Sequence, residues 1–249
     1  MGHHPKTWFH IIPGVDHHNV HMVTASFIVL ILIAGTWIVY PRVRDIRANL
    51  VPEKKFNLKS FFELLVEVLA GLSRDIIGPH HYKYLPFVGT IFIFIFFSNL
   101  IGMVPGFLPP TENWATGTAI AIISFIAYNY FGFSEHGPSY LKHFLAPISI
   151  QGVKSVALKL FLIIPLVAFH LLFGTIEIMS NFIRPVTLSV RLFINIFVDH
   201  LVLGIFSGLV PILLPIIFMV LGIFVCFMQA FIFTVLSMVY ISLATAHDH

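Results

Sequence analysis

The stretch from Glu177 to His200, EIMSNFIRPVTLSVRLFINIFVDH, carries charged side chains inside an apolar run over residues 156–207. An ionisable group at the middle of a bilayer costs about 2.5–3.5 kcal/mol on insertion scales, so these groups are not expected to face lipid. Glu177, Arg184 and Arg191 are spaced seven residues apart, which keeps them on one helix face with a drift of about 20° per step. A polar stripe on such a helix predicts a polar partner or an aqueous passage.

The rest of this stretch extends the stripe unevenly. Asn195 follows Arg191 by four residues and therefore stays near its face. Asp199 and His200 lie about 80° and 180° around an ideal helix from Arg191, so we expect His200 to face the following helix and Asp199 to lie nearer Arg191. The alternative is that one of the two only hydrogen-bonds to a neighbouring helix.

Composition identifies the class of protein. The chain is 58% hydrophobic and 10% charged, whereas soluble domains are roughly 25% charged. Continuous apolar runs predict an all-α polytopic membrane protein, since barrel strands would alternate. The net charge of +3 gives no indication of nucleic-acid binding, and the single cysteine, Cys226, cannot form an internal disulfide.

We expect one membrane domain over residues 1–249, oriented by its basic loops. The densest basic segment follows the first span, so the positive-inside rule places it in the cytoplasm, the N-terminus outside and the C-terminus inside. The charged segment 56–77 is predicted to be an amphipathic helix on the cytoplasmic surface, or alternatively a soluble helix packed on a partner. The expected segments are an external 1–22, spans 23–40, 86–104 and 115–133, and long helices 156–207 and 216–245.

The length of segment 156–207 poses a choice. As one helix it would be about 78 Å long, and the hydrocarbon core is only about 30 Å thick. It must either tilt strongly or break at Arg184-Pro185 into a hairpin. The residues at the possible break, 181–185, include no glycine for a tight turn. We therefore expect an unbroken helix over 156–207 that is strongly tilted and packs against a second long tilted helix over 216–245.

The first 21 residues contain six histidines, whose spacing matches no compact metal-ligand motif. An interfacial polar segment is the preferred interpretation, with a metal site as the alternative. No cofactor is expected.

Four motifs carry a family resemblance. Residues 189–196, SVRLFINI, closely resemble the Ser-x-Arg-Leu-Phe-Gly-Asn signature of subunit a of F-type ATP synthase, bacterial type. Residues 229–236 with Tyr240-Ile241 resemble its last-helix signature, and 99–105 and 13–18 are similar to its middle and N-terminal motifs. The likeness runs in the right order from about residue 10 to 245.

The resemblance implies a non-catalytic stator subunit that holds two offset aqueous half-channels for protons against a rotating c-ring of small helical hairpins. It also implies peripheral-stalk b-type subunits and membrane lipid as partners, and the cell inner membrane as location. Arg191 would be the barrier between the channels. The family's other proton-path positions match Glu177, Arg184, Asn195 and Gln229.

The sequence departs from the family in the signature and in the outer channel. Ile194 replaces the usual glycine, which should crowd the contact surface. Nine residues after Arg191 stands His200, where bacterial relatives usually have an acidic residue, and as its partners the last helix offers only Gly222, Cys226 and Gln229, of which only the thiol is titratable. The external proton carrier therefore remains open between Asp199 and His200.

The rival interpretations lack their own signals. A secondary transporter would usually show paired repeats with broken helices, and none is visible. A membrane enzyme is disfavoured because the sequence has neither His-Glu-x-x-His nor Gly-x-Ser-x-Gly. A haem protein is disfavoured because His170 and His200 would lie about 45 Å apart on one helix.

Overall fold

The computed structural model describes residues 19–44, 58–104, 107–137, 156–209 and 213–245. Regular structure in these residues is entirely helical, which confirms the all-α prediction. Most of the predicted N-terminal histidine segment (residues 1–18), most of the basic loop and the C-terminal tail lie outside the described residues. The long helices are α1 (Val20–Arg44), α2 (Leu58–Ile77), α3 (Leu85–Leu100), α4 (Trp114–His136), α6 (Val156–Leu209) and α7 (Leu213–Thr245), with short 3₁₀ turns η2 (His81–Lys83), η3 (Ile101–Met103) and η4 (Pro110–Glu112).

Among the described residues, five helices are long and apolar enough to cross a membrane, which confirms a multi-pass membrane protein. α4 is longer than the predicted span 115–133 at its C-terminal end, where it continues to His136. Its start is fixed by Asn113, whose side-chain oxygen accepts a hydrogen bond from the Ala115 backbone N–H at 2.9 Å. The candidate spans are Val20–Ile38, Leu85–Met103, Trp114–His136, Gly174–Phe206 and Ile216–Thr245.

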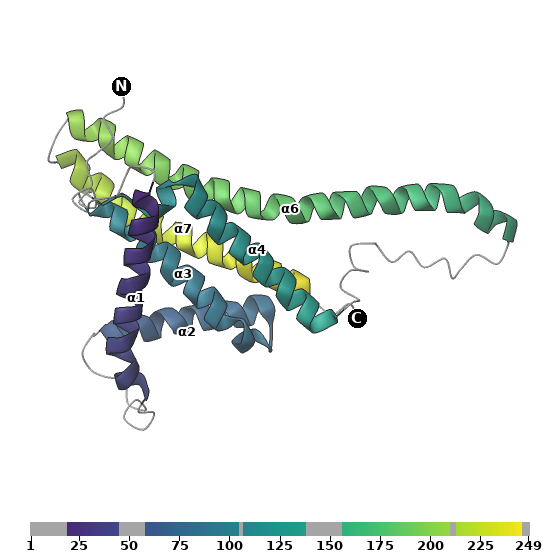
Figure 1. Cartoon of the computed structure of the whole chain (residues 1–249), viewed down its shortest axis with the longest axis horizontal. Coiled ribbons are helices and arrows are strands. Elements are labelled where there is room, and N and C mark those ends of the chain that lie inside the picture. The colour runs from purple at the N-terminus through teal and green to yellow at the C-terminus, as the bar shows by residue number, and fades with distance from the viewer. Residues whose placement is uncertain (1–18, 45–57, 105–106, 138–155, 210–212, 246–249) are drawn as a thin grey trace.

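The segment after residue 155 forms one helix rather than a hairpin. α6 has 54 residues and runs through Arg184-Pro185 without a break. Figure 1 shows α1 running from top to bottom while α6 lies across that direction. A helix of about 81 Å can stay within a membrane crossed by α1 only if it is strongly tilted. The tilted arrangement predicted from the sequence is therefore the one adopted.

Pro185 is tolerated because α4 supplies a replacement hydrogen bond. Proline has no N–H, so the carbonyl four residues earlier, at Asn181, loses its helical donor. The buried Tyr128 hydroxyl shares its one proton between this carbonyl oxygen, at 3.3 Å, and Asn181 Oδ1, at 2.6 Å. Such replacement is what permits proline within a membrane helix.

α2 is amphipathic, as predicted, and its apolar face packs against other helices of the same chain. Leu69 and Ser73 are buried on its inner face, and the Ser242 hydroxyl of α7 donates to the Ile76 carbonyl at 2.8 Å. The helix ends at Gly78, whose φ of +93° suits a glycine cap. In Figure 1, α2 lies across the foot of the bundle.

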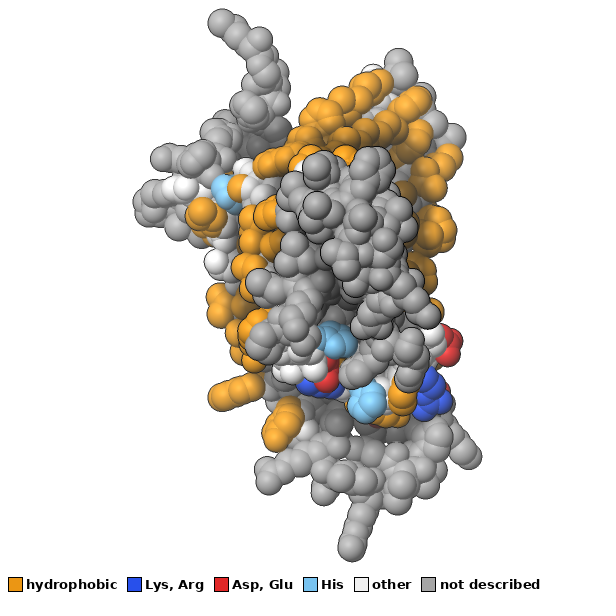
Figure 2. Space-filling view, turned by 90° about the vertical axis from the view of Figure 1, so that its right-hand side faces the viewer, with side chains coloured by type: hydrophobic (Ala, Val, Ile, Leu, Met, Phe, Trp, Pro, Cys, Tyr) orange, Lys and Arg blue, Asp and Glu red, His pale blue; other side chains and the backbone are white. Residues whose placement is uncertain are grey.

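The start of α3 and the end of α4 are joined by a polar cluster. Lys83 pairs with Glu135, and the buried Tyr84 hydroxyl donates to the same carboxylate at 2.9 Å. Burial, with the bond to Glu135, raises the pKa of Tyr84 to about 12, so its hydroxyl stays protonated. Figure 2 views the molecule from the right-hand side of Figure 1. Charged side chains gather on the lower part of this view, toward α2, and hydrophobic side chains cover the upper part.

Candidate functional site

The two long helices α6 and α7 run antiparallel and meet through polar side chains in a fixed register. Asn195 Nδ2 donates to Gln229 Oε1 at 2.5 Å, and the Arg184 guanidinium lies 4.9 Å from the ring centroid of Tyr240. Between the two contacts, the residue number falls by eleven along α6, from Asn195 to Arg184, and rises by eleven along α7, from Gln229 to Tyr240. Eleven residues are about three helical turns, so both contacts lie on the same face of each helix. Three predicted site residues, Arg184, Asn195 and Gln229, thus lie along one helix interface.

One face of the central part of α6 is closed by the rest of the chain. Leu188, Leu192 and Ile196 are at most 2% exposed. Beside them, the buried Ser189 hydroxyl is 2.8 Å from that of Thr118 on α4. At about 100° per residue, these side chains centre roughly 110° around the helix from Arg191.

The other face of α6 is open. Ile194, Phe197 and Val198 are 46–47% exposed and lie on the opposite side of Arg191 from the closed face. Ile194, which stands where the signature has glycine, lies on this exposed surface, and that it crowds a contact surface there stays a prediction.

Arg191 stands on the boundary between the two faces. Its side chain is exposed and forms no hydrogen bond or ion pair with any described residue. Behind it, Gln229 is 1% exposed, and its Nε2 donates to no described residue. A permanent cation on an apolar surface can stabilise an anionic group presented by a partner.

The predicted stripe continues toward the end of α6 with Asp199. This side chain is half-buried and interacts electrostatically with Cys226 of α7, which is fully buried. One turn earlier on α7, a Cβ at Gly222 would lie 2.7 Å from Met103 Sδ, so η3 occupies the space where a larger residue would stand. The predicted residues Glu177 and His200 both lie within α6, and their side chains are outside the described residues.

The sequence reasoning missed a set of polar residues that connect α4 to α6 and α7. Tyr128 contacts Asn181 as above, and Ser124 and Ser237 share a hydrogen bond of 3.0 Å. The signal was present in the sequence: Gly117, Ser124 and Tyr128 are small or polar residues seven and four apart, which places them on one face of a membrane helix.

Within the described part of the chain, no group of three His, Cys, Asp or Glu side chains could hold a metal ion. Five of the six N-terminal histidines, for which a metal site was the alternative, lie outside it, and the sixth, His21, lies in α1 with its Nδ1 3.3 Å from Asn113 Nδ2.

Comparison with known proteins gives one consistent result. The family model described as ATP synthase A chain matches residues 22–242. ATP synthase subunit a of Bdellovibrio bacteriovorus is 40% identical over 243 residues, covering 97% of this chain and 98% of that protein. ATP synthase subunit a 2 of Syntrophotalea carbinolica is 37% identical, covering 94% and 89%, and ATP synthase subunit a of Sorangium cellulosum is 35% identical, covering 94% and 86%. The chain belongs to the ATP synthase A chain family.

Proposed function

We propose that this chain is the proton-translocating stator subunit of a rotary ATP synthase. It provides two offset aqueous half-channels to and from a rotating c-ring, and Arg191 is the barrier between them. The observation that carries the proposal is the exposed Arg191 at the edge of the open apolar face of α6, one turn from the part-buried Asn195–Gln229 hydrogen bond.

The barrier role follows from the chemistry of arginine. Its guanidinium does not deprotonate in proteins, so a proton cannot hop across it. Its field keeps a neighbouring carboxylate ionised. A carboxyl group on the ring releases its proton as it reaches Arg191 and binds another after passing it. Rotation is thereby coupled to proton transfer between the two half-channels.

The two half-channels are assigned to the two sides of Arg191 along α6. With the N-terminus external and the C-terminus cytoplasmic, Glu177 and Arg184 lie toward the cytoplasmic half-channel, and Asp199 and His200 toward the external one. Glu177 and Asp199 are separated by about 33 Å along the helix. That distance is enough for two separate water paths.

The exposed surfaces support the proposed partners. The open face of α6 contacts the c-ring, because a single arginine within an apolar surface suits a partner that is apolar except for one carboxyl group per subunit. The remaining apolar exterior contacts lipid and the b-type subunits of the peripheral stalk. We assign the complex to the cell inner membrane and this chain to a non-catalytic role within it.

The first test compares proton conduction with solute uptake. The complex with its c-ring, reconstituted in liposomes, should conduct protons passively down an imposed potential, and the chain alone should take up no solute. Uptake of a solute by the chain alone, with no proton conduction through the complex, would instead support a secondary transporter.

The second test concerns the cytoplasmic half-channel. Glu177→Cys should react with charged, membrane-impermeant thiol reagents added from the cytoplasmic side of the assembled complex. Met179→Cys, about 200° around the helix, is the matched control and should not react. The native Cys226 is fully buried and should give little background. Protection of position 177 from both sides would contradict the half-channel.

A further inference from the structure

Arg184 reaches the α6–α7 interface, where no carboxylate among the described side chains pairs with it. Its side chain is half-buried and forms no ion pair with any described residue. Its guanidinium carbon lies 4.9 Å from the ring centroid of Tyr240, within the range of a cation–π contact. A desolvated cation needs compensation, and the negative face of an aromatic ring supplies it while leaving the N–H edge free for water.

The ring of Tyr240 is itself held in place from α4. Its centroid lies 5.8 Å from that of Tyr128, with the two rings tilted by 50°. Tyr128 is 2% exposed, and its hydroxyl binds Asn181, one turn before Arg184 on α6. The two tyrosines therefore contact α6 at consecutive turns, one at the carbonyl that Pro185 leaves without a donor and one at the guanidinium.

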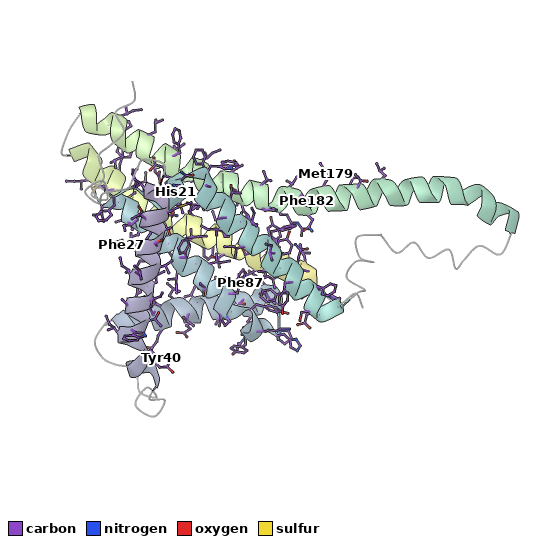
Figure 3. The ribbon with its side chains drawn as sticks, viewed as in Figure 1. His21, Phe27, Tyr40, Phe87, Met179 and Phe182 are labelled. Atoms are coloured by element: carbon purple, nitrogen blue, oxygen red, sulfur yellow. The ribbon has the colours of Figure 1, made fainter. Side chains whose placement is uncertain are left out.

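The turn of α6 around Arg184 makes two further contacts, one within α6 and one to α4. The Thr187 hydroxyl donates to the Arg184 carbonyl at 2.9 Å, and the ring of Phe182 lies 5.7 Å from that of Phe125 on α4. Figure 3 labels Phe182 where α6 leaves the neighbouring helices, beyond which it continues past Met179 away from the bundle. The Tyr240 contact is thus near the last place where α7 can orient a side chain of α6.

We propose that Tyr240 is a positioning residue for Arg184. Its ring holds the guanidinium at one point beside the cytoplasmic half-channel, three helical turns from the Asn195–Gln229 pair. This inference rests on the proposed function, because it assigns the positioned charge to the proton path. The hydroxyl of Tyr240 is not required for it, since the ring face makes the contact.

The experiment measures the position of Arg184 and proton transport separately. Modification of Arg184 by phenylglyoxal in the purified complex is followed by mass spectrometry, and proton-driven ATP synthesis is followed in liposomes. Tyr240→Leu should raise the modification rate and lower synthesis, each by ~2- to 30-fold, the range expected for a lost cation–π contact. Tyr240→Phe should restore both. Tyr130→Leu, which removes an exposed tyrosine of α4, is the control and should change neither.

Each outcome is decisive. An unchanged modification rate in Tyr240→Leu overturns the positioning role, and a raised rate with normal synthesis overturns its part in transport. If Tyr240→Leu does not assemble, Tyr240→Met, closer in volume, is measured instead. In the background Arg184→Gln, Tyr240→Leu should cause no further loss of synthesis, and an additive loss counts against the proposal. The modification rate does not depend on transport, so it stands even if the stator assignment fails.

Discussion

The closed and open faces of α6 differ in burial and in the partners of their polar groups. On the closed face, Leu188 and Leu192 pack inside the chain, and the buried Ser189 has its hydrogen-bond partner on α4. On the open face, Ile194 and Phe197 are about half-exposed, and Arg191 at its edge binds no described residue. Exposed apolar side chains are ordinary in a membrane, where lipid is as apolar as they are. An exposed arginine is not, because its charge needs a partner or water.

The difference separates two kinds of requirement. The closed face is satisfied by this sequence alone and gives α6 its position against α4 and α7. The open face leaves Arg191 in need of a partner or water, and we propose that the assembly supplies it. Substitutions on the closed face should therefore act on stability and register, and those at the open edge should act on transport in a complex that still assembles.

The largest effect is expected at the open edge. Arg191→Ala should abolish proton-driven ATP synthesis, because a carboxylate of the ring is no longer held ionised in mid-membrane. A passive proton leak should appear where the two half-channels become connected. The measurement is ATP synthesis and proton conduction in liposomes with matched enzyme content.

Ile194→Val, on the same open face, is the control and should leave synthesis near the wild-type rate. Synthesis near wild type in Arg191→Ala, with normal assembly, would show that the guanidinium only extends harmlessly to the membrane surface.

The second effect concerns the hydrogen bond that joins the closed face to α7. Gln229→Leu leaves the Asn195 amide without its acceptor and should slow synthesis by about 3- to 20-fold, from the worth of hydrogen bonds between membrane helices. The double variant Asn195→Leu with Gln229→Leu should recover part of this loss, because no polar group is then left unpaired. Equal losses in the single and double variants would assign the effect to the amides themselves rather than to their bond.

Much of this arrangement could be predicted from the sequence because it depends on periodicity. The seven-residue spacing of Arg184 and Arg191 placed both near one helix face, and the length of segment 156–207 required tilt. The bounds of α2, predicted as 56–77 and found as Leu58–Ile77, follow from its charged and apolar alternation. These features are local to one helix.

The rest depends on which helices meet and in what register. The pairing of Asn195 with Gln229 and of Arg184 with Tyr240 requires the antiparallel register of α6 and α7, which no pattern within either helix specifies. The sequence suggested that Pro185 could break the helix, because the donor that preserves it, Tyr128, lies 53 positions from Asn181. The close approach of Met103 to Gly222 was likewise not readable from helical spacing.

A smaller effect is expected where the polar stripe reaches the external side. His200→Ala should slow transport by a few-fold and shift its dependence on external pH, with little change in its dependence on internal pH, since histidine titrates near ~6.5. Asp199→Asn should act in the same way, more weakly if histidine is the main carrier and more strongly if aspartate is. The measurement is synthesis in liposomes with each side buffered separately.

The Asp199 and His200 variants also test whether this end of the polar stripe lines a water path to the external side. Cys226→Ser, which leaves both residues unchanged, is the control for packing around Asp199 and should keep the external pH profile of the wild type. An external pH profile that is unaltered in both single variants and in the double variant would remove the two residues from the path.

The smallest effect is expected within the closed face itself. Ser189→Ala removes the partner of the Thr118 hydroxyl, a bond of 2.8 Å between α6 and α4, and should lower the stability of the complex by about 0.6 kcal/mol, the mean for such bonds in membranes. Thr187→Val is the matched control, because Thr187 is exposed and its hydroxyl bonds only within α6. The measurement is thermal unfolding of the purified complex, with ATP synthesis recorded alongside. If Ser189→Ala left stability unchanged and slowed synthesis as Arg191→Ala does, the closed face would take part in transport directly, and the division between the two faces would be wrong.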